Sequence, residues 1–277
     1  MAGIIERTWW SHLSDYALLP ISALERKEGY VRVVTDFPSS FPNIVFETDL
    51  PAEGLEERIG EALAPFRERG LPLNWWIGPG TKPPELGDRL REMGFEKSLV
   101  FKGMYRSLAD LPRDLPSLDG VVFREVEDRN ELAERVELLG RAYGLDPAAC
   151  PLLLEMYDRL GYGPGKEWRH LAGYLGGRMV VAASVQLHPE AAVLHNVGAE
   201  PSLRRLGLAT AATLVALELA LSQGRETIVL QATGAGARLY RGLGFTECAE
   251  LSAHTLAGPG GGGIWREPVP GEQGGAE

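Results

Sequence analysis

The run Arg204-Arg205-Leu206-Gly207-Leu208-Ala209 has the residue types and spacing that bind phosphate where a helix begins. It follows a segment predicted as a strand and precedes an apolar, alanine-rich segment predicted as a helix. The first N–H groups of a helix lack partners and carry partial positive charge, so they can bind phosphate oxygens. Gly207 would let the main chain approach a ligand closely, and the small Ala209 would not obstruct it. R-x-x-G-x-A is a weak pattern on its own, because it also describes a glycine that only turns a strand into a helix.

Two longer stretches make this site more specific. The run from Asn196 to Thr210 resembles the acetyl-CoA loop of the GCN5-related N-acetyltransferase (GNAT) family. The run from Leu230 to Phe245, with its LY..LGF ending, resembles the strand and helix that follow this loop in the family. The resemblance covers roughly residues 121 to 256. It implies an α/β (α+β) fold in which a mixed, mostly antiparallel sheet is flanked by helices and two strands splay apart at the acetyl-CoA site.

The resemblance also implies where acetyl-CoA would bind. The strand before the loop would offer backbone groups to the peptide-like pantetheine arm, and a backbone N–H near Val197 would face the thioester oxygen, where negative charge develops. The start of the next helix would hold the pyrophosphate. The cofactor-binding residues implied in this way are Val197, Gly198, Ala199, Arg204, Arg205, Leu206, Gly207, Leu208, Ala209, Thr210 and Gly236.

Tyr240 matches the tyrosine that the family uses as a general acid, which implies that it protonates the departing CoA thiolate. An ordinary tyrosine pKa of about 10 keeps the hydroxyl protonated at neutral pH and suits it to this role. The alternative is a packing role beside Gly244-Phe245. Many members have an asparagine on the preceding segment that contacts the cofactor, whereas this sequence has Thr233-Gly234-Ala235-Gly236. We therefore expect backbone contacts in place of that side chain.

The general base that would deprotonate the amine is less well defined. His195 alternates with Val197 and Ala199, so on a regular strand it would share their face, and an ordinary pKa near 6.5 suits a base. A lone histidine in a strand also serves structural roles. Glu200 is the second candidate, expected at a solvated turn. The remaining histidines have no metal-ligand spacing and are expected at the surface or in packing: His12, His170, His188 and His254.

Composition limits the class of protein. The chain has 277 residues and a formal net charge of −10, which disfavours binding to nucleic acid. Its two cysteines, Cys150 and Cys248, form no close-spaced metal or redox motif, so we expect no metal and a reducing, cytoplasmic setting. No signal segment and no charge-free apolar run long enough for a membrane helix is evident, so no membrane association is expected.

The order of predicted elements divides the chain in two. Strand, helix, helix, three strands, helix, strand, helix and strand are expected from residue 121 onward. A proline- and aspartate-rich stretch before it reads LADLPRDLPSLDG, which is typical of a boundary. The predicted organisation is a GNAT-like N-terminal domain (1–110), a linker (111–120), an acetyltransferase domain (121–257) and a Gly/Pro-rich flexible tail (258–277).

The first half has a similar order of predicted strands and helices but lacks the cofactor loop. Its β-β-α-β-α-β order repeats the later part of the second half, and Gly94-Phe95 aligns with Gly244-Phe245 at an offset of 150 residues, which indicates a diverged duplication. At the matching helix start stand Glu53, Glu56 and Glu57, which would repel a pyrophosphate. Leu90 takes the place of Tyr240. The tryptophan pairs Trp9-Trp10 and Trp75-Trp76 are expected to pack in the core or between domains.

These observations predict an N-acetyltransferase that transfers an acetyl group from acetyl-CoA directly to a primary amine of a small molecule or peptide. The alternative is a non-catalytic acyl-CoA-binding sensor or interaction protein, and a third candidate is a different phosphate-ligand protein that uses the same helix start. The acidic balance agrees weakly with a cationic amine acceptor. A homodimer and a contribution of the first half to the acceptor pocket are left open.

Overall fold

The computed structural model describes residues 1–112 and 118–258, and these form one continuous mixed sheet with helices on both faces. The expected α/β class, with a mixed sheet flanked by helices, is confirmed. Residues 113–117 of the predicted linker (111–120) and residues 259–277 of the predicted tail (258–277) lie outside the described residues. The division into domains 1–110 and 121–257 remains a prediction.

The described sheet has eleven strands in the order β1-β2-β3-β4-β11-β5-β10-β9-β8-β7-β6. Neighbouring strands are antiparallel except for two parallel pairs, β3 with β4 and β9 with β10. The strands are β1 (Ser22–Lys27), β2 (Tyr30–Thr35), β3 (Ile44–Phe46), β4 (Leu73–Ile77), β5 (Glu96–Ser107), β6 (Val121–Glu125), β7 (Trp168–Leu175), β8 (Arg178–Leu187), β9 (Ala192–Ala199), β10 (Thr227–Ala232) and β11 (Thr246–Leu256).

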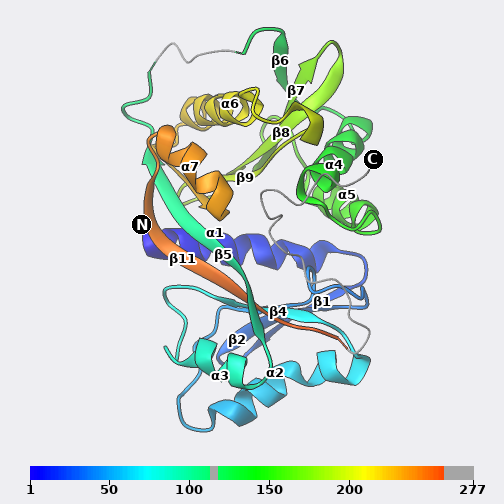
Figure 1. The fold of residues 1–277 in the computed structure, drawn as a ribbon, viewed down its shortest axis with the longest axis vertical. Coiled ribbons are helices and arrows are strands. Elements are labelled where there is room, and N and C mark those ends of the chain that lie inside the picture. Colours follow the sequence, from blue (N-terminus) through cyan, green and yellow to red (C-terminus); the bar gives the residue numbers. More distant parts are fainter. Residues whose placement is uncertain (113–117, 259–277) are drawn as a thin grey trace, which may run out of the picture.

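The helices cover both faces of this sheet (Figure 1). They are α1 (Ala2–Ser14), α2 (Leu55–Arg69), α3 (Leu86–Glu92), α4 (Arg129–Tyr143), α5 (Ala149–Leu160), α6 (Leu208–Ser222) and α7 (Gly234–Gly242), with short 3₁₀ turns at Asp15–Leu18 and Pro201–Leu203. Separate apolar clusters lie beneath α6 and beneath α2. A third cluster is shared by the two halves, because side chains of α1 and β4 pack into it together with those of α4 and β9.

The last strands of the two halves are exchanged. β5, which ends the first half, pairs with β10 of the second half, and β11, which ends the second half, pairs with β4 of the first. β5 and β11 also pair with each other along most of their length. Figure 1 shows them running together from the upper to the lower half, while α1 crosses the middle of the molecule. The two halves therefore share backbone hydrogen bonds as well as a core.

Most predicted elements are present, and two were missed. The second half has the expected order of strands and helices, with α6 beginning at Leu208 and α7 at Gly234. Helix α1 and strand β1 were not predicted from the sequence. No helix within residues 1–112 and 118–258 is both long and apolar enough to cross a membrane.

Candidate active site

Two parallel strands separate at the centre of the sheet. β9 and β10 are paired only from Ala192–Ile228 to Leu194–Leu230, although β9 continues to Ala199 and β10 to Ala232. A cavity of about 240 Å³ opens where the pairing ends. Its lining includes Leu194, His195, Asn196 and Val197 from β9, together with Gln231 and Ala232 from β10, Thr233 just beyond it and Gly236 and Tyr240 of α7. This is the splayed strand pair that the resemblance implied.

A bulge in β9 shapes the cavity wall. Ala182 faces Gly198 and Ser184 faces His195, so β9 has one more residue than β8 over this span. Asn196 has a φ of +53°, a left-handed conformation that asparagine tolerates better than most residues. Its Nδ2 donates a hydrogen bond of 2.7 Å to the Tyr157 hydroxyl on α5. The extra residue leaves backbone polar groups of β9 without a regular cross-strand partner.

The bulge also changes which side chains share a face. His195 packs beside His12 and Trp168, with ring centroids 4.6 and 5.1 Å away. Val197 and Ala199 instead pack against the cluster beneath α6. The expectation that His195 shares a face with Val197 and Ala199 was therefore wrong, because it assumed regular alternation along the strand.

The start of α6 is open and free of acidic side chains. Gly207 precedes it with a φ of +83°, and no side chain caps the helix or places a carboxylate in its first turn. Arg205 has a φ of +66°, and the loop residues from Arg204 to Gly207 are exposed. The corresponding helix of the first half, α2, also begins after a left-handed glycine, Gly54, but has Glu56 and Glu57 in its first turn. The two helix starts thus have similar backbone geometry but differ in charge, because only α2 has carboxylates in its first turn.

The loop before α6 is fixed by ion pairs. Glu200 is 7 % exposed and accepts hydrogen bonds from Arg141 and Arg178 at 3.2 and 3.3 Å. Arg204 donates to the backbone carbonyl of Ala142 at the end of α4. The expectation that Glu200 lies at a solvated turn was wrong, because its carboxylate is buried beneath the loop and holds it to the sheet and α4.

Tyr240 lines the cavity from α7. Its ring contacts Phe245 edge-on at 5.6 Å, and burial raises the pKa of its hydroxyl. A second tyrosine, Tyr143 of α4, lines the same cavity, and burial raises the pKa of its hydroxyl as well. Thr233, near the position where an asparagine is common in the resembled family, accepts a hydrogen bond from the Gly236 N–H and caps α7. Both phenols are thus protonated at neutral pH.

His195 is buried and uncharged. It is 6 % exposed, and its Nε2 lies 3.3 Å from the Gln186 side-chain oxygen. Burial, followed by the effects of His12 and Arg135, lowers the pKa of His195 well below its ordinary value. The imidazole is therefore uncharged at neutral pH and can accept a proton. The same lowered pKa makes it a weak base, because the protonated ring is strongly disfavoured in this position.

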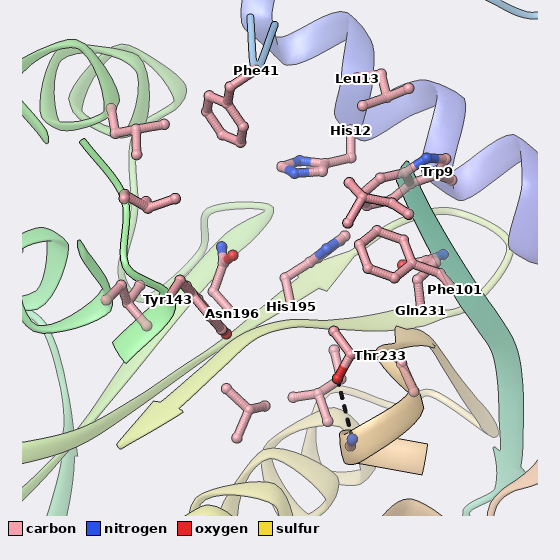
Figure 2. A pocket seen from close by; sticks show the side chains of 18 of the residues that line it. Trp9, His12, Leu13, Phe41, Phe101, Tyr143, His195, Asn196, Gln231 and Thr233 are labelled. Atoms are coloured by element: carbon pink, nitrogen blue, oxygen red, sulfur yellow. Dashed lines mark hydrogen bonds between the residues drawn. The ribbon is translucent and has the colours of Figure 1, made fainter. Parts of the chain in front are cut away.

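The first half contributes much of the cavity wall, including a histidine whose place in the cavity was not predicted from the sequence. His12 of α1, expected at the surface or in packing, is 5 % exposed, packs among aromatic rings and also lines the cavity. Its Nδ1 lies 3.6 Å from the Asp15 carboxylate, one helical turn further along the chain. Figure 2 shows His12 and Trp9 of α1 on the side of the cavity opposite Thr233. The His-x-x-Asp spacing next to apolar residues was the signal that could have identified this pair.

Within the residues that the structure covers, no group of three or more histidine, cysteine or acidic side chains is arranged to hold a metal ion. No known family model matches the sequence, and no curated protein does. Solved structures do resemble it. A GCN5-related N-acetyltransferase from Kribbella flavida matches with a TM-score of 0.69 and 21% identity, over 93% of this chain and 96% of its own.

A GCN5-related N-acetyltransferase from Sphaerobacter thermophilus matches with a TM-score of 0.68 and 16% identity, over 88% of this chain and 85% of its own. A tandem GNAT protein from the clavulanic acid biosynthesis pathway matches with a TM-score of 0.60 and 16% identity, over 87% of this chain and 85% of its own. These likenesses cover both halves and show that the chain has the fold of the GNAT acetyltransferases.

Proposed function

We propose that the protein is an N-acetyltransferase that transfers the acetyl group of acetyl-CoA directly to a primary amine. The observation that carries this proposal is the coincidence of two features at the same end of β9. The strands β9 and β10 separate there, and the uncapped start of α6 follows after a short loop. Open strand edges can pair with a peptide-like pantetheine arm, and an uncapped helix start can bind the attached pyrophosphate.

The proposed residue roles follow from this placement. The backbone of Val197, Gly198 and Ala199 pairs with the pantetheine arm, and a backbone N–H at the bulge faces the thioester oxygen. Gly236 lines the cavity at the start of α7, and its lack of a side chain lets the pantetheine arm pass close to this helix. The pyrophosphate lies against the N–H groups at the start of α6, within the run Arg204, Arg205, Leu206, Gly207, Leu208, Ala209 and Thr210, of which the first four residues are exposed.

The proposed reaction is a single displacement. The amine nitrogen attacks the thioester carbon, the C–N bond forms and the C–S bond breaks. Tyr240 donates its proton to the departing thiolate, which its raised pKa permits because the phenol stays protonated. A base takes the proton that the nitrogen loses. His195 and His12 both border the cavity, and His12 has the Asp15 carboxylate behind it to stabilise a positive charge.

Two measurements on the intact chain test this function. Thermal unfolding with acetyl-CoA is expected to shift to higher temperature, because a ligand that binds only the folded state stabilises it. Release of free CoA thiol is expected when a suitable amine is added. Stabilisation without CoA release across amines, amino acids and peptides would instead identify an acyl-CoA sensor. Stabilisation by a nucleotide and not by acetyl-CoA would identify a different phosphate ligand.

A further inference from the structure

The part of the cavity next to α1 is a chamber walled by aromatic rings. Trp9, Trp76 and Phe101 form a mutually packed group with ring centroids 5.0 to 5.6 Å apart. Phe41 packs on Tyr16 at 5.1 Å and extends the wall. In Figure 2, Phe41 and Trp9 lie on the α1 side, and Thr233 lies at the opposite end. All five rings line the cavity, and Trp9 and Trp76 are only 8 and 5 % exposed, so these two rings are held by their neighbours in the core.

The histidines His12 and His195 are the side chains of the described cavity lining that could carry a positive charge. Of the described side chains around the cavity, none is Asp, Glu, Lys or Arg. Its polar members include the amides Asn74, Asn196 and Gln231 and the imidazoles His12 and His195. A second ammonium group entering this chamber would lose its water shell and find no carboxylate in the wall, which disfavours it strongly.

The chamber nevertheless has one place suited to a single amine. His12 Nδ1 and Asp15 Oδ2 lie 3.6 Å apart, and neither atom has a hydrogen-bond partner among the described residues. They lie where α1 meets the separating strands, and the His12 ring is 4.6 Å from that of His195. An amine held here can give up its proton to an imidazole that has a carboxylate behind it. A plain acyl chain in the same space would leave these polar atoms unpaired.

We propose that the acceptor is a monoamine whose nitrogen is attached to an aromatic or similarly bulky apolar group. The apolar group lies among Trp9, Phe41, Trp76 and Phe101, and the nitrogen lies beside His12. This inference rests on the proposed acetyltransferase function and specifies its substrate class. It disfavours an acceptor with more than one positive charge, because the overall charge of −10 is not found in the cavity wall.

The test compares amines that differ at one end. Hexylamine and 1,5-diaminopentane are similar in length, but the second carries an additional ammonium group, and 2-phenylethylamine adds a ring. We expect kcat/KM for CoA release to be at least about 100-fold higher for 2-phenylethylamine and hexylamine than for 1,5-diaminopentane, because of the cost of burying the second charge. Equal or higher kcat/KM for the diamine would overturn the inference.

Binding measurements separate this inference from the proposed function. Acetyl-CoA is titrated calorimetrically into the same preparation, and absence of binding would refute the acetyltransferase itself. Binding of acetyl-CoA together with a preference for the diamine would refute only the acceptor class. If no amine is acetylated, 2-phenylethylamine must still bind to the CoA-loaded protein and 1,5-diaminopentane must not. Failure of 2-phenylethylamine to bind, or preferential use of decanoyl-CoA over acetyl-CoA, would overturn the inference.

A variant pair locates the chamber. Phe41 and Phe37 lie in the same loop and are both half-buried, but only Phe41 is part of the cavity lining. Phe41→Ala is expected to raise KM for 2-phenylethylamine roughly 10-fold, because apolar contact area is lost. Its KM for acetyl-CoA should not change. Phe37→Ala is the matched control and should leave both values unchanged, whereas an equal effect of the two substitutions would contradict the proposed location.

Discussion

Tyr240 is the residue whose protonation state matters most for the proposed reaction. Burial raises the pKa of its hydroxyl, so it stays protonated across the neutral range. We predict that Tyr240→Phe lowers kcat by about 100-fold or more, because general acid catalysis typically contributes roughly 100- to 10,000-fold, without changing the affinity for acetyl-CoA. Because the pKa is raised, kcat should not fall between neutral pH and the ordinary tyrosine pKa of about 10.

Tyr143 provides the control for this prediction. It lines the same cavity, and burial raises the pKa of its hydroxyl too, but it lies on α4 and outside the motif of the resembled family. Tyr143→Phe is expected to leave kcat within about twofold of the unmodified protein. Steady-state kinetics in which both variants lose activity equally, or in which Tyr240→Phe loses none, would remove Tyr240 from the acid role.

The buried histidines should make the protein sensitive to acid. Burial, with smaller effects of Lys97 and Arg91, lowers the pKa of His254 to about 4. His254 is 3 % exposed, and its unfolded-state pKa is near 6.5. The folded form therefore binds this proton less readily than the unfolded form. The resulting stability is fully present above pH 6.5 and is lost as the pH falls toward 4, by an amount on the order of 3 kcal/mol.

Urea unfolding at pH 7.5 and at pH 4.5 measures this loss. His254→Gln is expected to lose less unfolding free energy between the two values than the unmodified protein, because its side chain cannot take up the proton. His170 and His195, whose pKa values burial also lowers, supply the remaining dependence. His188→Gln is the control at a half-exposed turn. The same acid dependence in all three proteins would show that His254 does not contribute.

At the element scale, periodicity predicted the strands and helices of the second half well but missed α1. The buried residues Ile5, Trp9, His12 and Leu13 recur at helical spacing, so the signal was present in the sequence. Strand β1 was harder to find, since its sequence SALERK is half-exposed and largely polar at the edge of the sheet.

The bulge at Asn196 marks a limit of periodicity at this scale. Alternation along a strand assigns each side chain to a face only while the strand is regular. One additional residue in β9 reverses the assignment beyond it, so His195 and Val197 were placed together in error. The splay between β9 and β10 was expected only from the family resemblance, since neither strand has a local sequence feature that ends the pairing.

The starts of α2 and α6 can be compared directly, because they occupy corresponding positions in the two halves. Gly54 and Gly207 both precede a helix with φ values of +70° and +83°, and a Cβ added at either would meet no atom closer than 3.8 Å. A substitution therefore causes similar backbone strain at the two sites, about 1 kcal/mol for a non-glycine residue. They differ in charge, because only α2 has glutamates in its first turn. The sequence alone predicted this difference.

At the scale of the whole molecule, the exchange of β5 and β11 was not predictable from local sequence. The aligned endings Gly94-Phe95 and Gly244-Phe245 indicated two related halves, and each final strand could pair with its own half or with the other. Two related halves present similar strand edges, so local preference does not distinguish the partners. The structure pairs each final strand with the opposite half and places α1 against both.

This exchange predicts that neither half folds alone. A fragment of residues 118–277 lacks β5, which lies beside β10, and lacks both partners of β11. A fragment of residues 1–112 lacks β11 between β4 and β5. Each is expected to show no cooperative urea transition, because long strand edges and the shared core are exposed. An equimolar mixture refolded together should recover the transition, whereas a cooperative 118–277 fragment that binds acetyl-CoA by itself would contradict the prediction.

The central claim is that acetyl-CoA binds at the start of α6, and one calorimetric comparison tests it directly. Acetyl-CoA is titrated into the unmodified protein, Gly207→Glu and Gly54→Glu. Because a glutamate at Gly207 would block and repel the pyrophosphate, we predict that its dissociation constant rises by at least about 100-fold. Gly54→Glu should bind as the unmodified protein does. Equal affinity of all three proteins would contradict the account.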